Sequence, residues 1–254
     1  MPKQPKYRSY MICTAPRSGS TLLCGQLAAT GRAGNPDSYL HRQSLDEWLS
    51  DHNLTREAYA SDREAAAAVL AAAQKKGEAG TGIFGLRMQR PSFAFFMEQA
   101  AALFPGVPTD ADRIRAAFGE TLYIHLSRRD KLAQAISMVK AEQTGLWHRN
   151  ADGSELERLA PPCSPAYDAR RIRDKIETLT ALDAEWPDWF AREGIKPLCL
   201  IYEDLSADPQ DALARVLAAL DLDPNLAEAV KTPTAKLADE ISQQWAARFR
   251  AERA

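Results

Sequence analysis

The sequence contains little cysteine, no long apolar run and no excess of charge of either sign. Its four cysteines, Cys13, Cys24, Cys163 and Cys199, have no C-x-x-C spacing, which excludes the common zinc and small-disulfide patterns, so we interpret them as buried or incidental thiols. No apolar stretch reaches the roughly 20 residues that a membrane helix needs. The charged start is not followed by a signal-type hydrophobic region. We therefore expect a cytoplasmic protein without a membrane span.

The charge balance excludes a broad basic surface. The chain has 32 Lys and Arg against 34 Asp and Glu, a formal net charge of −2, so no global positive field is present to hold a nucleic acid. Any anion site must be local, and we expect small-molecule partners. With 254 residues, 45% of them hydrophobic, the chain can bury a substantial core, and we expect a single domain over residues 1–254. The frequency of twofold assemblies favours a homodimer.

Four short apolar runs alternate with helical segments and are bounded by Gly, Pro or charged residues. They lie at 8–13, 82–88, 122–126 and 197–202. Such runs are typical of central strands in a parallel sheet, and the alternation places helices on both of its faces. The sequence therefore predicts an α/β fold, P-loop-like and three-layered, with a central, mainly parallel sheet flanked by helices.

Two segments late in the chain are harder to interpret. Residues 165–194 are long, charged and helical in pattern, and we expect a helix or helix pair that is kinked or broken at Pro187. Residues 147–165 contain Gly153 and three prolines, which predicts an irregular loop of the kind that often binds or covers a substrate.

The segment from Thr14 to Thr21 connects the first predicted strand to a helix start at Leu22. A strand, a tight polar turn and a helix direct several unpaired backbone N–H groups and the positive end of a helix dipole at one point. With the hydroxyls and the guanidinium of Arg17, this arrangement predicts a site for a phosphate-like anion. A turn of Ser and Thr that only caps the helix is the structural alternative.

The same segment lacks the lysine of a nucleoside-triphosphate loop. Thr14 stands where the first glycine of that motif belongs, and Ser20 replaces the lysine that reaches the terminal phosphates. The loop therefore argues against ordinary ATP or GTP hydrolysis. A small-molecule kinase-like phosphotransferase and a nonenzymatic nucleotide-binding protein remain as alternatives.

A second group of basic residues follows the strand predicted at 122–126. Arg128 and Arg129 come directly after it, Asp130 can cap the next helix, and Ser137 lies two turns further on. Because open α/β sheets bind ligands at the carboxyl ends of their strands, these residues predict a second phosphate site. An exposed salt-bridge cluster is the alternative for an Arg-Arg-Asp turn.

Together the two motifs resemble the cytosolic sulfotransferases that use 3′-phosphoadenosine 5′-phosphosulfate (PAPS). That donor carries a phosphosulfate at one end and a separate 3′ phosphate at the other. The resemblance implies that Arg128 and Ser137 bind the 3′ phosphate, with Arg129 as the alternative to Arg128. It implies a phosphosulfate site made by Arg17, Ser18, Gly19, Ser20 and Thr21.

More narrowly, the chain resembles the trehalose 2-O-sulfotransferase family. The matching motifs lie at 17–23, 30–36, 128–137 and 143–147 and in a tail at 238–248. The resemblance implies transfer of a sulfuryl group to a hydroxyl of a carbohydrate or glycolipid, trehalose-like acceptor. A sulfuryl group carries less negative charge than a phosphoryl group, so amides, hydroxyls and one cation can balance it, and we expect no metal. Arg17 is then the catalytic cation that stabilises charge on the leaving oxygen.

One position departs from this family. The resemblance places a glutamate, the proposed general base, two residues beyond a proline, and this chain has Ser38 there. Asp37 and His41 are the remaining candidates for the base and for acceptor binding. Asp37 is adjacent to Ser38 in the sequence. A histidine with an unperturbed pKa near 6.5 suits a general base. Arg87 and Trp147 are further candidates for the acceptor pocket.

Overall fold

The computed structural model describes residues 6–150, 152–231 and 239–252; the start of the chain and Ala238 of the tail motif lie outside these ranges. Its main sheet has four parallel strands in the order β2-β1-β3-β6. The strands are β1 (Ser9–Thr14), β2 (Phe84–Gln89), β3 (Thr121–Ser127) and β6 (Leu198–Ile201). Each coincides with one of the four predicted apolar runs.

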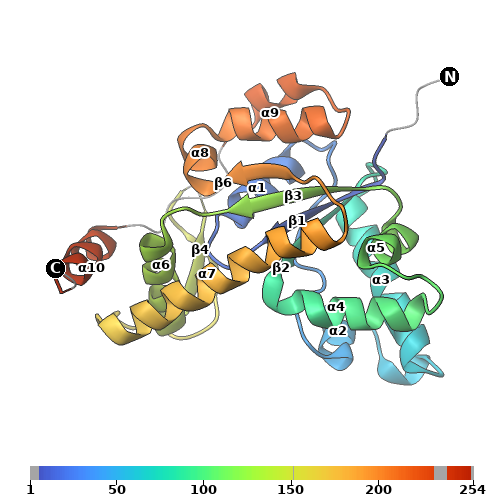
Figure 1. Ribbon diagram of the computed structural model, residues 1–254, viewed down its shortest axis with the longest axis horizontal. Helices are drawn as coiled ribbons and strands as arrows, with labels where there is room; N and C mark the ends of the chain where they lie inside the picture. The colour runs from blue at the N-terminus through green and yellow to red at the C-terminus, as the bar shows by residue number, and fades with distance from the viewer. Residues whose placement is uncertain (1–5, 151, 232–238, 253–254) are drawn as a thin grey trace.

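The sheet lies between two layers of helices (Figure 1). Strand β1 is buried along its whole length, and its side chains alternate between the two faces: Met11 and Cys13 join one core cluster, Tyr10 and Ile12 the other. The first cluster includes residues of α2 (Leu45–Asp51), α3 (Asp62–Glu78), α4 (Arg90–Leu103), α5 (Asp110–Phe118) and the end of α7 (Ala169–Arg192). The second includes residues of α1 (Ser20–Ala29), α8 (Tyr202–Ala207), α9 (Pro209–Ala219) and the 3-10 helix η2 (Pro224–Ala229). The predicted three-layer α/β fold is confirmed.

A third cluster extends the molecule beyond the sheet. It joins α6 (Lys131–Thr144), the first half of α7 and α10 (Glu240–Ala251), whose Trp245 and Phe249 are buried in it. Helix α10 lies at one end of the molecule in Figure 1. This cluster positions α6, which carries Ser137, beside the carboxyl edge of the sheet.

Helix α7 is not broken at Pro187. It runs from Ala169 to Arg192 with the proline inside it. An interior proline removes a helical hydrogen bond and costs about 3 kcal/mol. Trp186 and Trp189 are buried against the sheet layer, and the Trp186 indole donates a hydrogen bond to the Thr14 carbonyl at 3.0 Å, so tertiary packing offsets that cost.

The segment predicted as an irregular loop contains a β-hairpin instead. Strands β4 (Leu146–Arg149) and β5 (Glu155–Arg158) pair antiparallel. The turn is closed by two backbone hydrogen bonds of 2.9 Å, from Gly153 N–H to the Asn150 carbonyl and from Asn150 N–H to the Ser154 carbonyl, with Gly153 at φ 85°. A glycine in the left-handed region allows this tight reversal, and residues 159–168 that follow are in neither helix nor strand.

Candidate active site

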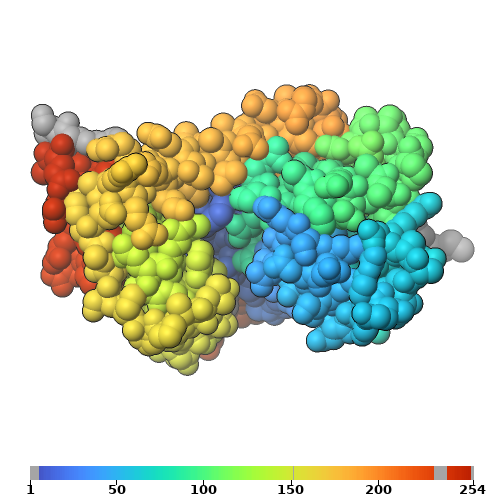
Figure 2. All heavy atoms as spheres, turned by 90° about the horizontal axis from the view of Figure 1, so that it is seen from below, coloured from blue at the N-terminus to red at the C-terminus, as the bar shows by residue number. Residues whose placement is uncertain are grey.

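A cleft of about 1470 Å³ opens at the carboxyl edge of the sheet. Figure 2 shows it as a hollow between the hairpin side and the segment that follows α1. Both predicted anion sites and the predicted acceptor residues border this single cleft. The predicted residues that line it are Arg17, Gly19, Ser20, Thr21, Asp37, His41, Arg87, Arg128, Ser137 and Trp147, and Ser38 lines it as well.

The loop between β1 and α1 has an unusual backbone. Arg17 (φ 63°) and Gly19 (φ 82°) both lie in the left-handed region. A Cβ atom on Gly19 would come within 2.3 Å of the Tyr202 ring, so only glycine fits there. Gly19 is the N-cap of α1 and offers no side chain to its first N–H groups, which stay available to an anion.

Neighbouring side chains hold this loop in place. Ser18 is fully buried, and its hydroxyl donates to the Ala15 carbonyl at 2.9 Å, so it braces the loop from inside. Gln134 of α6, also fully buried, donates to the Pro16 carbonyl at 2.7 Å. Any contact of Ser18 with a ligand would therefore come from its backbone N–H.

Arg17 connects the two predicted anion sites. Its Nε donates to Ser137 Oγ at 3.0 Å, and its Nη1 donates to the Trp147 carbonyl at 2.7 Å. Burial, together with the positive charge of Arg128, lowers the pKa of Arg17 to about 10. The guanidinium remains charged at neutral pH, and a bound anion would favour its charged form.

Arg128 has an unsatisfied donor in the same cleft. Its Nη1 donates to the Arg17 carbonyl at 3.1 Å and its guanidinium lies 4.3 Å from the Tyr202 ring centroid, while its Nε is buried without a hydrogen-bond partner. Burial lowers the pKa of Arg128. Arg129 instead turns away and pairs with Asp204 at 3.1 Å. A largely buried guanidinium at the cleft wall favours an anionic ligand group beside it.

Arg87 ties the donor loop to the predicted acceptor side. It donates from Nη1 to Thr21 Oγ1 at 2.8 Å, from Nε to Ser38 Oγ at 2.7 Å and from Nη2 to Asp37 Oδ1 at 2.9 Å. Its backbone N–H also donates to the Asp37 carbonyl at 3.0 Å, which fixes this segment along β2. Ser38 therefore serves as an acceptor for Arg87 at the position where the resemblance implies a glutamate.

His41 lies on the same side of the cleft. Its Nδ1 is 2.8 Å from the Ser38 carbonyl, which can only accept, so Nδ1 carries the proton. The same nitrogen is 3.8 Å from Asp51. The structure thus brings Asp37, Ser38 and Arg87 into one hydrogen-bonded group with His41 beside it.

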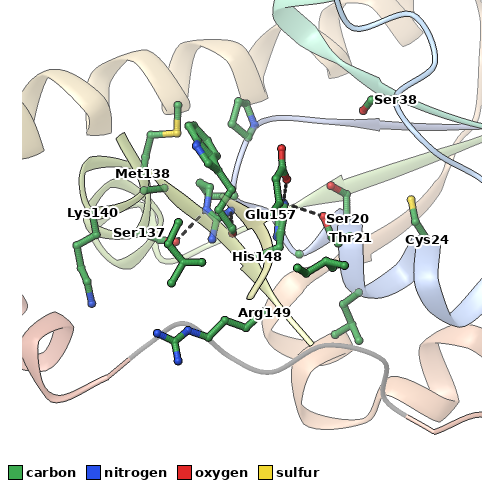
Figure 3. A pocket seen from close by; sticks show the side chains of 18 of the residues that line it. Ser20, Thr21, Cys24, Ser38, Ser137, Met138, Lys140, His148, Arg149 and Glu157 are labelled. Carbon is green, nitrogen blue, oxygen red and sulfur yellow. Dashed lines mark hydrogen bonds and ion pairs between the residues drawn. The ribbon is translucent and has the colours of Figure 1, made fainter. Parts of the chain in front are cut away.

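His148 and Glu157, two hairpin residues outside the motifs found in the sequence, also face the cleft, as Figure 3 shows. His148 Nε2 lies 3.1 Å from Thr21 Oγ1 and 3.4 Å from Glu157 Oε2. Burial, with the charges of Arg17 and Arg87, lowers the pKa of His148 to about 3, so its ring is neutral at physiological pH.

Two kinds of feature are missing from the described part of the chain. No cluster of three or more His, Cys, Asp or Glu side chains there is arranged to hold a metal ion. No helix in those ranges combines the length and hydrophobicity needed to cross a bilayer.

Comparison with known proteins gives consistent matches over nearly the whole chain. The model of the family described as Stf0 sulphotransferase matches residues 9–252. Trehalose 2-sulfotransferase from Mycobacterium tuberculosis (strain ATCC 35801 / TMC 107 / Erdman) is 29% identical over 265 residues, covering 96% of this chain and 95% of the relative. The protein of the same name from Mycolicibacterium smegmatis (strain ATCC 700084 / mc(2)155) is 29% identical over 259 residues, covering 95% and 94%. The sulfotransferase domain of the Synechococcus PCC 7002 olefin synthase is 16% identical, with a TM-score of 0.43 and coverage of 98% and 97%.

Proposed function

This chain belongs to the Stf0 sulphotransferase family, whose model matches residues 9–252, and on that premise we propose that it transfers a sulfuryl group from PAPS to a hydroxyl of a carbohydrate or glycolipid acceptor. The observation that carries the proposal is the set of unsatisfied anion-binding groups in one cleft. Arg128 brings a largely buried guanidinium to the cleft wall, and helix α1 begins with no side-chain cap. A donor with two anionic ends would engage both.

We assign the two ends of the donor to the two sides of Arg17. The N–H groups and hydroxyls of Gly19, Ser20 and Thr21 would hold the phosphosulfate, because an open helix N-terminus favours negative charge. Arg128 and Ser137, which both line the cleft, would hold the 3′ phosphate. Arg17 contacts Ser137 and lies between the two groups.

Arg17 is also the cation best placed to assist the transfer. As the acceptor oxygen attacks in line, negative charge develops on the oxygen that bridges sulfur and phosphorus, and a preorganised guanidinium stabilises that charge. Because burial and Arg128 lower the pKa of Arg17 to about 10, its charge is poorly compensated in the free protein and gains from this interaction. The sulfuryl group needs less countercharge than a phosphoryl group, so the proposed step uses no metal.

The acceptor would enter past Asp37, His41, Arg87 and Trp147. The first three offer hydrogen-bonding groups suited to sugar hydroxyls, and Trp147 offers a ring that already lies 5.9 Å from the Arg17 guanidinium. A trehalose-like disaccharide is supported by the two relatives named trehalose 2-sulfotransferase. Because Asp37 is engaged by Arg87 at 2.9 Å, we assign it to acceptor binding.

Transfer of radiolabelled sulfate from PAPS tests this function. The purified protein is incubated with labelled PAPS and, separately, with trehalose, glucose and a trehalose glycolipid, and the products are resolved by chromatography. We expect label to appear in at least one sugar acceptor and to be lost in Arg17→Ala. Absence of transfer to every acceptor, together with no release of adenosine 3′,5′-bisphosphate, would contradict the proposal.

A thermal-shift comparison separates the donor classes. Adenosine 3′,5′-bisphosphate should raise the melting temperature, because a ligand that binds only the native state stabilises it. ATP with Mg²⁺ should have a smaller effect, since the loop has Ser20 where a nucleoside-triphosphate loop has lysine. The reverse order would favour a kinase-like phosphotransferase.

A further inference from the structure

We propose that His148 is the general base that removes the proton from the acceptor hydroxyl, and that Glu157 stabilises the imidazolium that results. The inference rests on the proposed sulfuryl transfer and names the residue that the Ser38 position does not supply. Both side chains come from the β4–β5 hairpin, on the opposite wall of the cleft from Ser38.

The position of His148 carries the argument. Its Nε2 lies 3.1 Å from the hydroxyl of Thr21, a residue in the first turn of α1 that would itself help to hold the phosphosulfate. Its side chain is 25% exposed, so a substrate can reach it. Asp37 and His41 make no such direct contact with residues 19–21 among the hydrogen bonds and ion pairs of the described chain. Of the three candidates, His148 is therefore the one placed at the reacting end of the donor.

The proposed role needs the tautomer of His148 in which Nε2 carries no proton. Arg87 donates from Nη1 to Thr21 Oγ1 at 2.8 Å, and the Thr21 hydroxyl can donate its own proton to His148 Nε2 at 3.1 Å. A ring nitrogen that accepts this bond is unprotonated and can take a proton from another hydroxyl. A donor oxygen that recruits the Thr21 hydroxyl would leave Nε2 open to the acceptor.

Glu157 is the cross-strand neighbour of His148 in the hairpin. Its Oε2 lies 3.4 Å from Nε2. A carboxylate cannot donate to the neutral ring, but it forms a charge-assisted hydrogen bond once Nε2 is protonated. The pairing therefore stabilises His148 selectively in the state formed during transfer.

The charged groups facing His148 explain how its basicity changes during the reaction. In the free protein, burial and the charges of Arg17 and Arg87 lower the pKa of His148 to about 3, while Glu157 is the facing carboxylate. A polyanionic donor bound to the arginines offsets their effect and moves the pKa upward, toward the range in which a base is effective.

The acceptor oxygen forms a bond to sulfur, and the bond between sulfur and the bridging oxygen of the 5′ phosphate breaks. The electron pair of that bond stays on the leaving adenosine 3′,5′-bisphosphate, and the acceptor proton moves to His148 Nε2. The imidazolium then returns its proton to solvent.

Replacement of His148 gives the first test. His148→Gln and His148→Ala are compared with wild type for release of adenosine 3′,5′-bisphosphate from PAPS, with trehalose present and with water as the acceptor. General bases contribute about 10²- to 10⁴-fold, so we expect at least a 100-fold loss of turnover and an affinity for adenosine 3′,5′-bisphosphate within about twofold of wild type. Added imidazole should restore part of the rate of His148→Ala, which a merely structural role would not allow.

Two outcomes separate this inference from the proposed function. Wild-type protein that does not turn over PAPS would contradict the proposed function. Wild-type protein that does, while His148→Gln keeps its rate within about threefold, would overturn only the role of His148. A larger loss of turnover at saturating acceptor concentration in Asp37→Asn or His41→Gln than in His148→Gln would overturn the assignment of the base to His148.

The hairpin supplies a matched control for Glu157. Glu155 lies on the same strand but pairs with Arg158 and does not line the cleft. We expect Glu157→Gln to lower turnover and Glu155→Gln to leave it unchanged. Equal effects of the two variants would contradict the pairing of Glu157 with a protonated His148.

An NMR titration gives a readout independent of turnover. The chain has four histidines, so the ring Cε1–Hε1 signals can be followed individually. We expect adenosine 3′,5′-bisphosphate to raise the pKa of His148 by at least about one unit, because its phosphates offset the charges of Arg17 and Arg87. An unchanged His148 titration in the saturated complex would overturn the proposed coupling.

Discussion

Replacement of Gly19 by alanine should lower both the stability of the fold and the affinity for the donor. The alanine would be strained in the left-handed backbone conformation and would also clash with Tyr202. Gly19 has φ 82°, and an alanine in the left-handed region costs about 1–2 kcal/mol. Its Cβ would also lie 2.3 Å from the Tyr202 ring, and such overpacking typically costs about 1–3 kcal/mol more. We expect Gly19→Ala to lose about 2–5 kcal/mol of the free energy of unfolding.

The displaced ring matters for the ligand as well. Tyr202 lies 4.3 Å beneath the Arg128 guanidinium, and a cation–π contact of this kind is worth about 0.5–2 kcal/mol. If Tyr202 moves aside, Arg128 loses its support, and the affinity for adenosine 3′,5′-bisphosphate should fall by about 2- to 30-fold. Urea denaturation measures the first effect, and calorimetric titration measures the second.

Gly80 provides the matched control. It has φ 78°, but an added Cβ would meet nothing within 4 Å. Gly80→Ala should therefore show only the backbone cost of about 1–2 kcal/mol and no change in ligand affinity. If Gly19→Ala matched Gly80→Ala in both measurements, the close packing of the loop on Tyr202 would not be what positions Arg128.

Three further predictions follow from the same contacts. Arg128→Ala should weaken the binding of adenosine 3′,5′-bisphosphate in calorimetry by at least about tenfold, since hydrogen bonds between charged groups are worth about 1.5–3 kcal/mol. Arg129→Ala should leave this affinity unchanged, because Arg129 pairs with Asp204. Equal effects of the two variants would contradict the assignment of Arg128. Arg87→Lys should destabilise the fold by about 1–3 kcal/mol in urea, because lysine cannot reproduce three directed hydrogen bonds, and an unchanged midpoint would refute this. The pKa of His148 is lowered to about 3 in the folded protein, so below pH 6.5 this histidine binds a proton more readily in the unfolded chain. The free energy of unfolding should therefore fall as the pH drops from 6.5 toward 3, and it should fall less in His148→Gln. Parallel pH profiles of the two proteins would contradict this expectation.

The layer architecture could be predicted because local patterns determine it. An apolar run that is buried on both faces, such as residues 9–14, is recognisable without any tertiary information. The two motifs predicted to bind anions can be found in the sequence, since each lies at the end of a predicted strand. Their shared cleft cannot, because the bond between Arg17 and Ser137 joins residues 120 positions apart.

The β4–β5 hairpin could not be predicted from the sequence. The turn around Gly153 was a usable signal, but prolines in the following residues favoured an irregular loop over the whole segment. Missing the hairpin meant missing His148 and Glu157, which face each other only through its register. Pro187 predicts a kink or break in the helix, but α7 continues through it because the buried tryptophans on either side stabilise the helix.

The central claim is that one cleft holds both anionic ends of an adenosine 3′,5′-bisphosphate carrier, and calorimetric titration with two nucleotides tests it most directly. Adenosine 3′,5′-bisphosphate and adenosine 5′-monophosphate differ only in the 3′ phosphate that Arg128 and Ser137 are proposed to bind. The account predicts that the bisphosphate binds at least about tenfold more tightly, as one charged hydrogen bond to the phosphate would supply. Equal affinities, or no binding of either nucleotide, would contradict it.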